Sequence, residues 1–365
     1  MKNINPIEII FFVTSLEIGG TENQIFLLMK NINKDKFKVS VFPIFLKGKL
    51  KEKFINENIK IEFLKCKSFF IRNFLMTIKL IFIRKSIIHF YLPLSYLIYG
   101  PLCLIINKHT LIMSRRSSNV YQNGKPFVKF VEKFLHNKIS SIIGNSNAVI
   151  NELLKEKVNP EKLHLIYNSL ELNKFKSPVT KKFSSRLIRI ICIANLREYK
   201  GYFDLINALK IIKSEIVEDF ELIIIGRDQG IKNKLKEKVI KYKLEKIIKF
   251  LGEKNNVVPY LNNSDIGVLA SHQEGFSNSI LEYMAAGLPI VVTNIGGNTE
   301  AVIDKLNGFV VPIKDPYKLA CALKILILNP SKRRTMGLAS REIIEKKFNL
   351  KILVNSHEKL YSKVF

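Results

Sequence analysis

The sequence predicts an α/β protein in which parallel sheets are covered by helices, and three observations lead to this fold class. Short apolar runs typical of buried strands alternate with helical patterns along the whole chain, as in parallel sheets joined by crossover helices. The 365 residues exceed one ordinary domain and suit two of roughly 150 to 200 residues. Hydrophobic residues make up 47% and charged residues 25%, which is a globular composition. We therefore expect two α/β domains with a cleft between them.

The expected strands fall into two series. In the first half of the chain they are Glu8–Thr14, Lys38–Pro43, Ile87–Tyr91, Thr110–Ser114, Ser141–Gly144 and Leu163–Ile166. In the second half they are Ile188–Ile193, Glu221–Ile225, Ile248–Leu251, Ile266–Leu269, Ile290–Thr293 and Gly308–Val310. The polar stretch from Asn173 to Arg186 separates the two series and is the expected linker. We accordingly expect a first domain over residues 1–175 and a second over residues 186–345.

Two apolar segments require a choice between a strand and a membrane segment. The run IEIIFFVTS near the start follows no signal-peptide pattern, because Glu8 interrupts it and no small-residue cleavage site follows. The run from Ser86 to Asn107 has no formal charge and is long enough to cross a bilayer. Pro93 and the strand-like Ile87–Tyr91 favour a buried strand followed by a helix instead.

The chain is strongly basic, with 59 Lys and Arg against 31 Asp and Glu and a net charge of +28. No acidic residue occurs from Phe63 to Val131, where basic residues alternate with aromatic and aliphatic ones. This mixture favours an anionic membrane surface or a lipid-linked phosphate as a partner. No nucleic-acid-binding signature is present, so we expect no nucleic-acid partner; a general Lys- and Ile-rich composition is the alternative explanation. The cations expected to meet a membrane are Arg72, Lys79, Arg84 and Lys85.

The cysteines favour a reducing compartment. They are widely spaced in apolar surroundings and form no C-x-x-C pair, as expected for reduced, buried thiols. They are Cys66, Cys103, Cys192 and Cys321. We expect the protein to be cytoplasmic, with peripheral attachment to the inner face of the membrane as an extension of that location.

The most function-specific pattern is SHQEGFSNSILEYMAAGLPIVVTNIGGNTEAV, residues 271–302. A strand ends just before it, and Ser277 and Asn278 suit the start of a helix running to Ala286. Backbone N–H groups at a helix start bind phosphate.

Two carboxylates accompany that helix start. Glu274 lies in the loop at the carboxyl end of the strand, and Glu282 lies further along the helix. A carboxylate is a natural partner for the two hydroxyls of a ribose. Taken singly, either Glu also fits a solvated surface acid.

A second junction, IICIANLREYKGYFDLINALKII (residues 190–212), places Arg197 and Lys200 between a strand and a helix. Two cations facing a diphosphate would neutralise the charge that develops as a nucleoside diphosphate leaves. Alternatively, Arg197 and Lys200 are ordinary basic residues exposed to solvent.

Residues 271–302 resemble the E-x7-E motif of the retaining glycosyltransferases of family 4, with the E-G-F opening, the A-A-G-L-P continuation and a G-G-x-x-E loop. The earlier junction resembles the family pattern G-R-L-x-x-x-K-G, with Lys200 and Gly201 in place, Asn195 at the Arg position and Arg197 two residues later. The resemblance is strong over residues 188–310 and weak before them. It implies the GT-B fold, in which two Rossmann-like domains face each other across a cleft. It also implies a final helix, residues 346–365, packing back on the first domain.

The resemblance also implies roles for individual residues. Glu274 approaches the hydroxyls of the donor sugar, and Glu282 holds the ribose. Arg197 and Lys200 hold the leaving phosphates, which gives a catalytic set of Arg197, Lys200 and Glu274. The backbone that contacts the sugar and phosphates is that of Gly275, Phe276, Ser277 and Asn278.

The first half offers weaker candidates. Gly19 and Gly20 follow the first strand, where they allow close approach of a phosphate or sugar, and their position resembles the family's glycine loop. His89 ends a strand on the expected cleft side. The family's usual histidine position after the next strand reads MSRRSSN here, so Arg115 or Arg116 is the alternative contact for an anionic acceptor.

The expected function is the transfer of a sugar, with retention, from a nucleotide-sugar to a lipid-linked saccharide in bacterial surface polysaccharide assembly. No metal motif is present in the sequence, so neither a metal nor a cofactor is expected. Two alternatives stay open: a non-catalytic, membrane-associated nucleotide-binding protein, and a nucleotide-sugar epimerase of the same fold. No acid and base pair for the epimerase can be named from the sequence.

Overall fold

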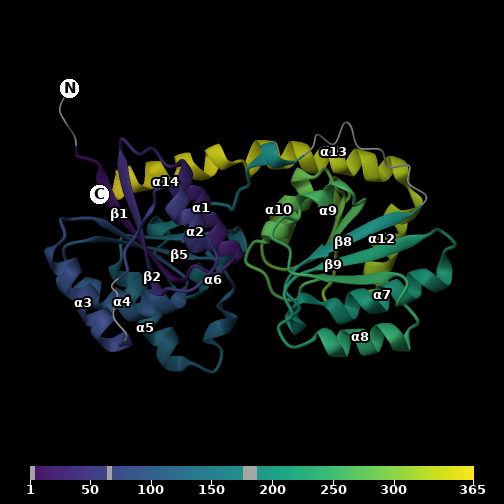
Figure 1. The fold of residues 1–365 in the computed structure, drawn as a ribbon, viewed down its shortest axis with the longest axis horizontal. Coiled ribbons are helices and arrows are strands. Elements are labelled where there is room, and N and C mark those ends of the chain that lie inside the picture. Colours follow the sequence, from purple (N-terminus) through teal and green to yellow (C-terminus); the bar gives the residue numbers. More distant parts are fainter. Residues whose placement is uncertain (1–4, 64–67, 176–186) are drawn as a thin grey trace. The chain divides into compact units, whose positions relative to one another are not determined.

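The computed structural model describes residues 5–63, 68–175 and 187–365, and the chain forms two compact units (Figure 1). The first unit comprises Met1–Asn168 together with Leu350–Phe365, and the second comprises Ser169–Asn349. Each unit is built around its own parallel sheet, so the predicted α/β fold class is confirmed. Of the predicted linker, residues 176–186 lie outside the described part of the chain.

The sheet of the first unit has seven strands in the order β3-β2-β1-β4-β5-β6-β7, and each strand runs parallel to its neighbours. The strands are β1 (Ile7–Ser15), β2 (Phe37–Phe45), β3 (Lys60–Ile61), β4 (Ile87–Tyr91), β5 (Thr110–Arg115), β6 (Ser141–Gly144) and β7 (Leu163–Leu165). Neighbouring side chains of β1 point to opposite faces of the sheet. Phe11 belongs to the hydrophobic core on one face, and Phe12 belongs to the core on the other face. A strand buried on both faces must be apolar without interruption, which explains the run IEIIFFV.

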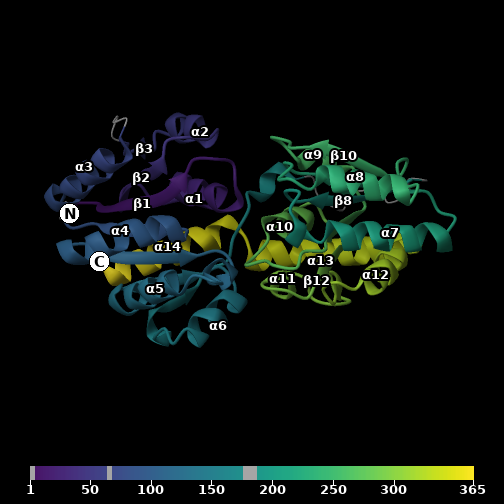
Figure 2. The ribbon, with the colours of Figure 1, turned by 90° about the horizontal axis from the view of Figure 1, so that it is seen from below.

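Helices cover both faces of this sheet (Figures 1 and 2). The core on one face receives side chains from α1 (Gly20–Asn31), α2 (Leu50–Asn56) and α14 (Leu350–Val364). The core on the other face receives them from α3 (Phe69–Phe82), α4 (Pro93–Ile106), α5 (Pro126–Lys138) and α6 (Asn147–Lys155). The return of α14 to this unit places Leu353, Leu360 and Tyr361 in the first of these cores.

The sheet of the second unit has six strands in the order β10-β9-β8-β11-β12-β13. They are β8 (Ile188–Ile193), β9 (Phe220–Ile225), β10 (Ile248–Gly252), β11 (Ile266–Leu269), β12 (Ile290–Thr293) and β13 (Gly308–Val311). The helices of this unit are α7 (Tyr202–Glu215), α8 (Lys232–Lys241), α9 (Val258–Asn262), α10 (Asn278–Ala285), α11 (Asn298–Ala301), α12 (Pro316–Leu328) and α13 (Pro330–Lys347). The strand order reverses between β8 and β11, and parallel α/β sheets bind their ligands at the carboxyl ends of the strands beside such a point.

All of the strands predicted from the sequence are present, with small shifts at their ends. The strand that was not predicted is β3, which has two residues and is too short to produce an apolar pattern. The uncharged run from Ser86 to Asn107 forms β4 and α4 as predicted. Within the described residues, no helix has both the length and the apolarity needed to cross a membrane.

Candidate functional site

The site is built where β8 and β11 end, and α10 is fixed against this point by two hydrogen bonds. Ser279 on α10 donates its hydroxyl to the carbonyl of Ile193 over 2.6 Å. The backbone N–H of Ile193 in turn donates to the Tyr283 hydroxyl over 2.7 Å. These bonds give partners to the backbone C=O and N–H groups of the last residue of β8. They also hold the start of α10 beside the carboxyl end of the sheet.

Lys200 and Glu274 meet at this edge. The Lys200 ammonium lies 2.6 Å from the Glu274 carboxylate, and both side chains are largely buried, with 16% and 10% exposed. Gly201, which follows Lys200, has a φ of +68° and lies so close to β11 that a Cβ would be 1.8 Å from the carbonyl oxygen of Ala270. Glycine alone fits this position. The turn is therefore pressed onto the end of β11, which brings Lys200 to Glu274.

Arg197 and Lys200 both lie close to the ring of Tyr199. The Arg197 guanidinium lies 5.8 Å from the centroid of the Tyr199 ring and donates to its hydroxyl over 3.3 Å. The Lys200 ammonium lies 5.3 Å from the same ring centroid. Cations are attracted to the face of an aromatic ring, so Tyr199 helps to hold both. Sequence reasoning missed Tyr199, since one tyrosine in a turn carries no motif.

The loop from Glu274 to Ser277 is fixed by its neighbours. The Gly275 carbonyl accepts a hydrogen bond of 2.7 Å from the N–H of Gly297. The Phe276 side chain is buried against Phe348, with ring centroids 5.3 Å apart. Phe276 therefore contributes its backbone, and not its ring, to any ligand contact at this edge.

Helix α10 begins where the sequence predicts, with Ser277 at the N-cap and Asn278 as its first residue. The Ser277 hydroxyl makes no capping hydrogen bond to the helix. The start of α10 thus directs its positive dipole end toward the edge that carries Glu274.

Glu282 lies on the same helix and has no hydrogen-bond or ion-pair partner among the described residues for its carboxylate. Burial raises the pKa of Glu282 from 4.5 to about 7. The side chain is half-buried, and a carboxylate partly removed from water without a hydrogen-bond donor is unfavourable. Two hydroxyl groups that donate to it would therefore stabilise its charged form.

A hydrogen-bonded pair that sequence reasoning did not identify lies next to these residues. The His272 Nε2 is 2.6 Å from a carboxylate oxygen of Asp204, and the His272 backbone N–H donates to the Tyr199 carbonyl over 2.7 Å. A shallow depression of about 560 Å³ adjoins the pair. Its lining residues are Glu198, Tyr199, Phe203, His272, Gln273, Ile313 and Lys314.

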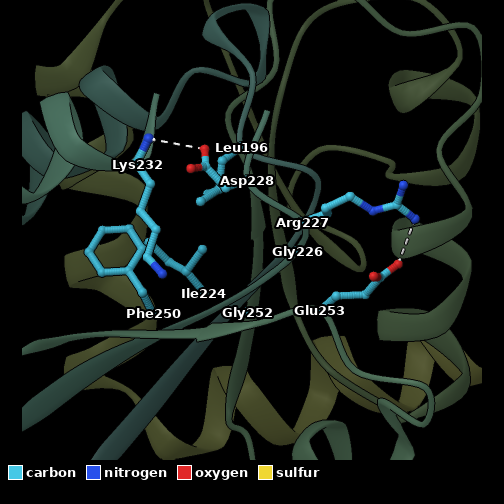
Figure 3. A pocket seen from close by; sticks show the side chains of 9 residues that line it. All are labelled: Leu196, Ile224, Gly226, Arg227, Asp228, Lys232, Phe250, Gly252 and Glu253. Carbon is cyan, nitrogen blue, oxygen red and sulfur yellow. Dashed lines mark hydrogen bonds and ion pairs between the residues drawn. The ribbon is translucent and has the colours of Figure 1, made fainter. Parts of the chain in front are cut away.

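A second cavity, of about 140 Å³, lies at the carboxyl ends of β9 and β10 (Figure 3). Arg227 and Glu253 form an ion pair of 2.9 Å on its lining. An Asp228 carboxylate oxygen accepts backbone hydrogen bonds from Gly230 and Lys232. The full lining is Leu196, Ile224, Gly226, Arg227, Asp228, Lys232, Phe250, Gly252 and Glu253. Within the described residues, no group of three or more His, Cys, Asp or Glu side chains could hold a metal ion.

Three of the predicted residues in the first unit lie in its interior. His89 has no exposed surface, and its ring nitrogens lie 2.8 Å from the Tyr361 hydroxyl and 2.8 Å from the Ser114 hydroxyl. Burial lowers the pKa of His89 well below 6.5, so the ring is neutral. His89 lies in the middle of β4 and not at its end, where the sequence had suggested it; its contact with an acceptor stays a prediction.

The two arginines of the first unit are also engaged. Arg115 is 1% exposed and pairs with Glu156 over 2.6 Å, so its charge is compensated inside the unit. Arg116 is 9% exposed, donates to the Asn168 side chain and lies 5.1 Å from the Tyr91 ring centroid. Contact of Arg116 with an acceptor stays a prediction.

Gly19 and Gly20 lie at the carboxyl end of β1, where Gly19 is the N-cap of α1 and Gly20 its first residue. A Cβ on Gly19 would lie 2.2 Å from a carboxylate oxygen of Glu22. Burial raises the pKa of this Glu22 carboxyl. The approach of backbone to a ligand at Gly19 and Gly20 also stays a prediction.

Fold and site together define a two-unit α/β protein with a candidate site at a strand-order reversal, and comparison with known proteins gives the class. Residues 18–174 match the family model described as Glycosyltransferase Family 4, and residues 173–343 match the one described as Glycosyl transferases group 1. The chain belongs to the family 4 glycosyltransferases, and the resemblance inferred from its motifs is confirmed.

Individual relatives are distant. The chain is 26% identical over 282 residues to N-acetyl-alpha-D-glucosaminyl L-malate synthase of Bacillus anthracis, covering 75% of this chain and 73% of that protein. It is 28% identical over 214 residues to the UDP-Gal:alpha-D-GlcNAc-diphosphoundecaprenol alpha-1,3-galactosyltransferase of Escherichia coli, covering 56% of this chain and 55% of that protein. The chain thus matches little more than half of the Escherichia coli relative.

The fold agrees with solved structures over nearly the whole chain. HepE of Anabaena, solved in complex with UDP, superimposes with a TM-score of 0.85 at 20% identity, covering 98% of this chain and 100% of that one. This confirms the predicted GT-B class of fold.

Proposed function

We propose that this chain is a retaining glycosyltransferase that moves a sugar from a nucleotide-sugar to a lipid-linked saccharide in surface polysaccharide assembly. The observation that carries the proposal is the arrangement at one sheet edge of the Lys200–Glu274 pair and the unpartnered Glu282 carboxylate. A cation suits a diphosphate and a carboxylate suits a ribose. The two needs of a nucleotide-sugar are met within one unit.

Each residue has a distinct part in the proposed reaction. Glu282 accepts the ribose hydroxyls, which gives hydrogen-bond donors to its unpaired, half-buried carboxylate. Lys200 and Arg197 stabilise the charge that grows on the diphosphate as its bond to the sugar breaks. Glu274, already beside Lys200, orients the hydroxyls of the donor sugar.

Retention is proposed to follow a front-face course. The acceptor hydroxyl forms a bond to the anomeric carbon on the face from which the diphosphate departs. A leaving phosphate oxygen takes the proton of that hydroxyl, and the products are the glycoside and the nucleoside diphosphate. This course requires no covalent intermediate with a side chain, which suits a site where Glu274 is already paired with Lys200.

The relatives support UDP-sugars as the first donors and a lipid-linked acceptor. HepE was solved with UDP, and the Escherichia coli relative is named for UDP-Gal and a diphosphoundecaprenol acceptor. The described cysteines are free, and Cys103 and Cys192 are buried, which supports a reducing, cytoplasmic location for the reaction.

A panel of UDP-sugars tests the proposal. The true donor should raise the melting temperature, since a ligand at 100 times its dissociation constant adds about 2.7 kcal/mol of stability. With an undecaprenyl-diphosphate-linked sugar added, nuclear magnetic resonance of the product should show the anomeric configuration of the donor. Formation of an epimeric nucleotide-sugar without acceptor would identify an epimerase instead. Nucleotide binding without any turnover across the panel would identify a non-catalytic protein.

A further inference from the structure

Helix α5 of the first unit presents a row of aromatic side chains to solvent. Phe127, Phe130 and Phe134 are 76%, 69% and 51% exposed. Their spacing of three and four residues puts them on one side of the helix, while Leu135 and His136 on the other side are buried. A single exposed apolar side chain is ordinary, but a contiguous row of large ones marks an interaction surface.

The neighbouring helices extend this apolar surface. On α3, Phe74 is 65% and Phe82 is 81% exposed, and on α4, Ile105 is 81% exposed. Helix α4 contacts both α3 and α5, and all three contribute to the core on the same face of the sheet. Figures 1 and 2 show α3, α4 and α5 as neighbouring helices of the first unit. The outer side of this helix layer is therefore one surface, which we call the α3–α5 face.

Among the described residues of α3, α4 and α5, no carboxylate is exposed. From Glu62 to Glu152 the sequence contains a single intervening acidic residue, Glu132. Glu132 is buried, 3.6 Å from the Arg115 guanidinium, and accepts hydrogen bonds from Tyr121. Its charge is compensated inside the unit, so the face is apolar and cationic only.

Three of the four cations predicted from the sequence to meet a membrane are engaged within the unit. Arg72 is 8% exposed and donates to a backbone carbonyl of β2 over 2.7 Å. Lys79 pairs with Glu62 over 2.5 Å. Lys85 donates to the Phe365 carbonyl over 2.8 Å. Arg72 is too deeply buried to meet a membrane as expected, whereas membrane contact of Lys79 and Lys85 stays a prediction.

Other cations on this layer are available. They are exposed, and within the described residues their side chains have no hydrogen-bond or ion-pair partner. They are Arg84, Lys125, Lys129, Lys133 and Lys138. Lys129 and Lys133 are four residues apart and run alongside the aromatic row of α5.

We propose that the α3–α5 face docks on an anionic phospholipid surface, with Phe127, Phe130 and Phe134 inserted at the interface and Lys129 and Lys133 facing the headgroups. Aromatic side chains flanked by Lys are the composition of helices that lie in a membrane interface. Charge complementarity favours this occupant over a second copy of the chain, because a symmetric contact between copies would oppose like charges. The inference concerns the first unit and stands independently of the proposed donor chemistry.

Two variants test the proposal by co-sedimentation with vesicles of phosphatidylcholine and phosphatidylglycerol. The triple change Phe127→Ser, Phe130→Ser, Phe134→Ser should reduce vesicle binding at least about tenfold, because the inserted area is lost. The double change Lys129→Gln, Lys133→Gln should reduce it roughly 25-fold at low salt, since each basic residue near an anionic surface contributes about fivefold. Added salt should weaken wild-type binding.

A matched control removes similar side chains from α8 of the second unit. Ile240 is 61% exposed, and Lys236 and Lys241 are exposed beside it. The combined change Ile240→Ser, Lys236→Gln, Lys241→Gln should leave vesicle binding unchanged. Thermal unfolding and UDP binding by each variant verify that the units are folded.

Several outcomes would overturn the proposal. One is a wild-type protein that ignores anionic vesicles at low salt, and another is a triple Ser variant that sediments like the wild type. Equal binding to pure phosphatidylcholine would remove the role of charge. Self-association of the wild type in sedimentation velocity, abolished by the triple Ser change and with no vesicle binding, would assign the face to a second copy. None of these results depends on donor turnover.

Discussion

Two carboxylates at the same sheet edge differ in what accompanies them. Glu274 is beside the Lys200 ammonium, so burial of its charge is compensated. Glu282 is half-buried with no such partner, and its pKa rises to about 7. The first is already satisfied in the unliganded protein, whereas the second destabilises it whenever it is ionised.

The change Glu282→Gln should therefore stabilise the unliganded protein at alkaline pH. A raised carboxyl pKa means that the folded state holds its proton more tightly than the unfolded state, so stability falls as pH rises from about 4.5 to 7 and stays lower above. Removing the charge should recover up to about 3 kcal/mol at pH 8 and almost nothing at pH 4. Chemical denaturation of both proteins at the two pH values measures this.

The change Glu282→Gln should stabilise the fold but weaken nucleotide binding. Hydrogen bonds from ribose hydroxyls to a charged carboxylate contribute about 1.5 to 3 kcal/mol, so UDP affinity should fall roughly 10- to 100-fold above pH 7. Wild-type affinity should decline as the pH drops through 7, and the variant should lose that dependence. A variant with unaltered UDP affinity by calorimetry would remove Glu282 from the site.

The change Lys200→Ala should impair turnover more than it impairs nucleoside binding. The charge that Lys200 meets grows during bond cleavage, so kcat should fall roughly 100-fold or more while uridine affinity changes little. Steady-state kinetics and calorimetry separate the two effects. As a control, Lys236→Ala on the exposed side of α8 should stay near wild-type turnover. Equal losses for uridine and UDP-sugar would contradict the role.

At the level of secondary-structure elements, the site depends on how tightly loops are pressed against strand ends. Gly201 lies against Ala270 at the end of β11, and Gly296 has a φ of +55° with a Cβ position 2.0 Å from the Glu274 carbonyl oxygen. Both contacts are between backbones. They place the Lys200 turn and the Glu274 loop more firmly than side-chain packing alone would.

The change Gly201→Ala should accordingly destabilise the second unit and displace Lys200. A Cβ at 1.8 Å from the Ala270 oxygen forces a backbone shift, in addition to about 1 kcal/mol of strain for a left-handed residue. We expect a loss of more than about 3 kcal/mol together with a large drop in turnover. Gly230→Ala is the matched control, because its φ is +101° and nothing lies within 4 Å of its Cβ position. It should show the strain alone, and equal losses for both variants would refute the steric argument.

For the whole molecule, the described structure consists of two units, and the first is discontinuous in sequence. Residues 350–365 supply Leu353 and Tyr361 to its core, and Tyr361 holds the buried His89 ring. The second unit, residues 169–349, holds the proposed donor residues by itself. Damage to one unit should therefore be separable from damage to the other.

Deletion of residues 350–365 should unfold the first unit and spare donor binding. The deletion removes several fully buried side chains, each worth roughly 1.5 to 3 kcal/mol, and leaves the buried Nδ1 of His89 without its Tyr361 partner. Together these losses exceed the stability of an ordinary domain. Circular dichroism should show loss of part of the helical signal, and calorimetry should show UDP binding within a few-fold of the full chain. Loss of UDP binding with the second unit still folded would place donor contacts outside residues 169–349.

The sequence predicted the sheets well because buried parallel strands are apolar on both faces, as the IEIIFFV run of β1 shows. It also predicted the start of α10, since Ser277 and Asn278 are strong local signals. The partners of three side chains could not be predicted, because tertiary packing brings together residues that are distant in sequence. The pairs are His89 with Tyr361, Arg115 with Glu156, and Lys79 with Glu62. The contacts of Tyr199 and of the His272–Asp204 pair also depend on tertiary packing and give no pattern in the sequence.

Because α14 returns to the first unit, that unit can complete its fold only after the second unit has been synthesised. Residues 1–168 leave the ribosome first, yet their sheet lacks the helix formed by Leu350–Val364 until the second unit has been synthesised. At about 5 to 20 residues per second, this interval lasts roughly 10 to 40 s. During that time the apolar surface of the first sheet that packs against Leu353, Leu360 and Tyr361 is exposed to solvent. We therefore expect the first half of the chain to depend on chaperones during synthesis, whereas the second unit can complete its fold as soon as it emerges.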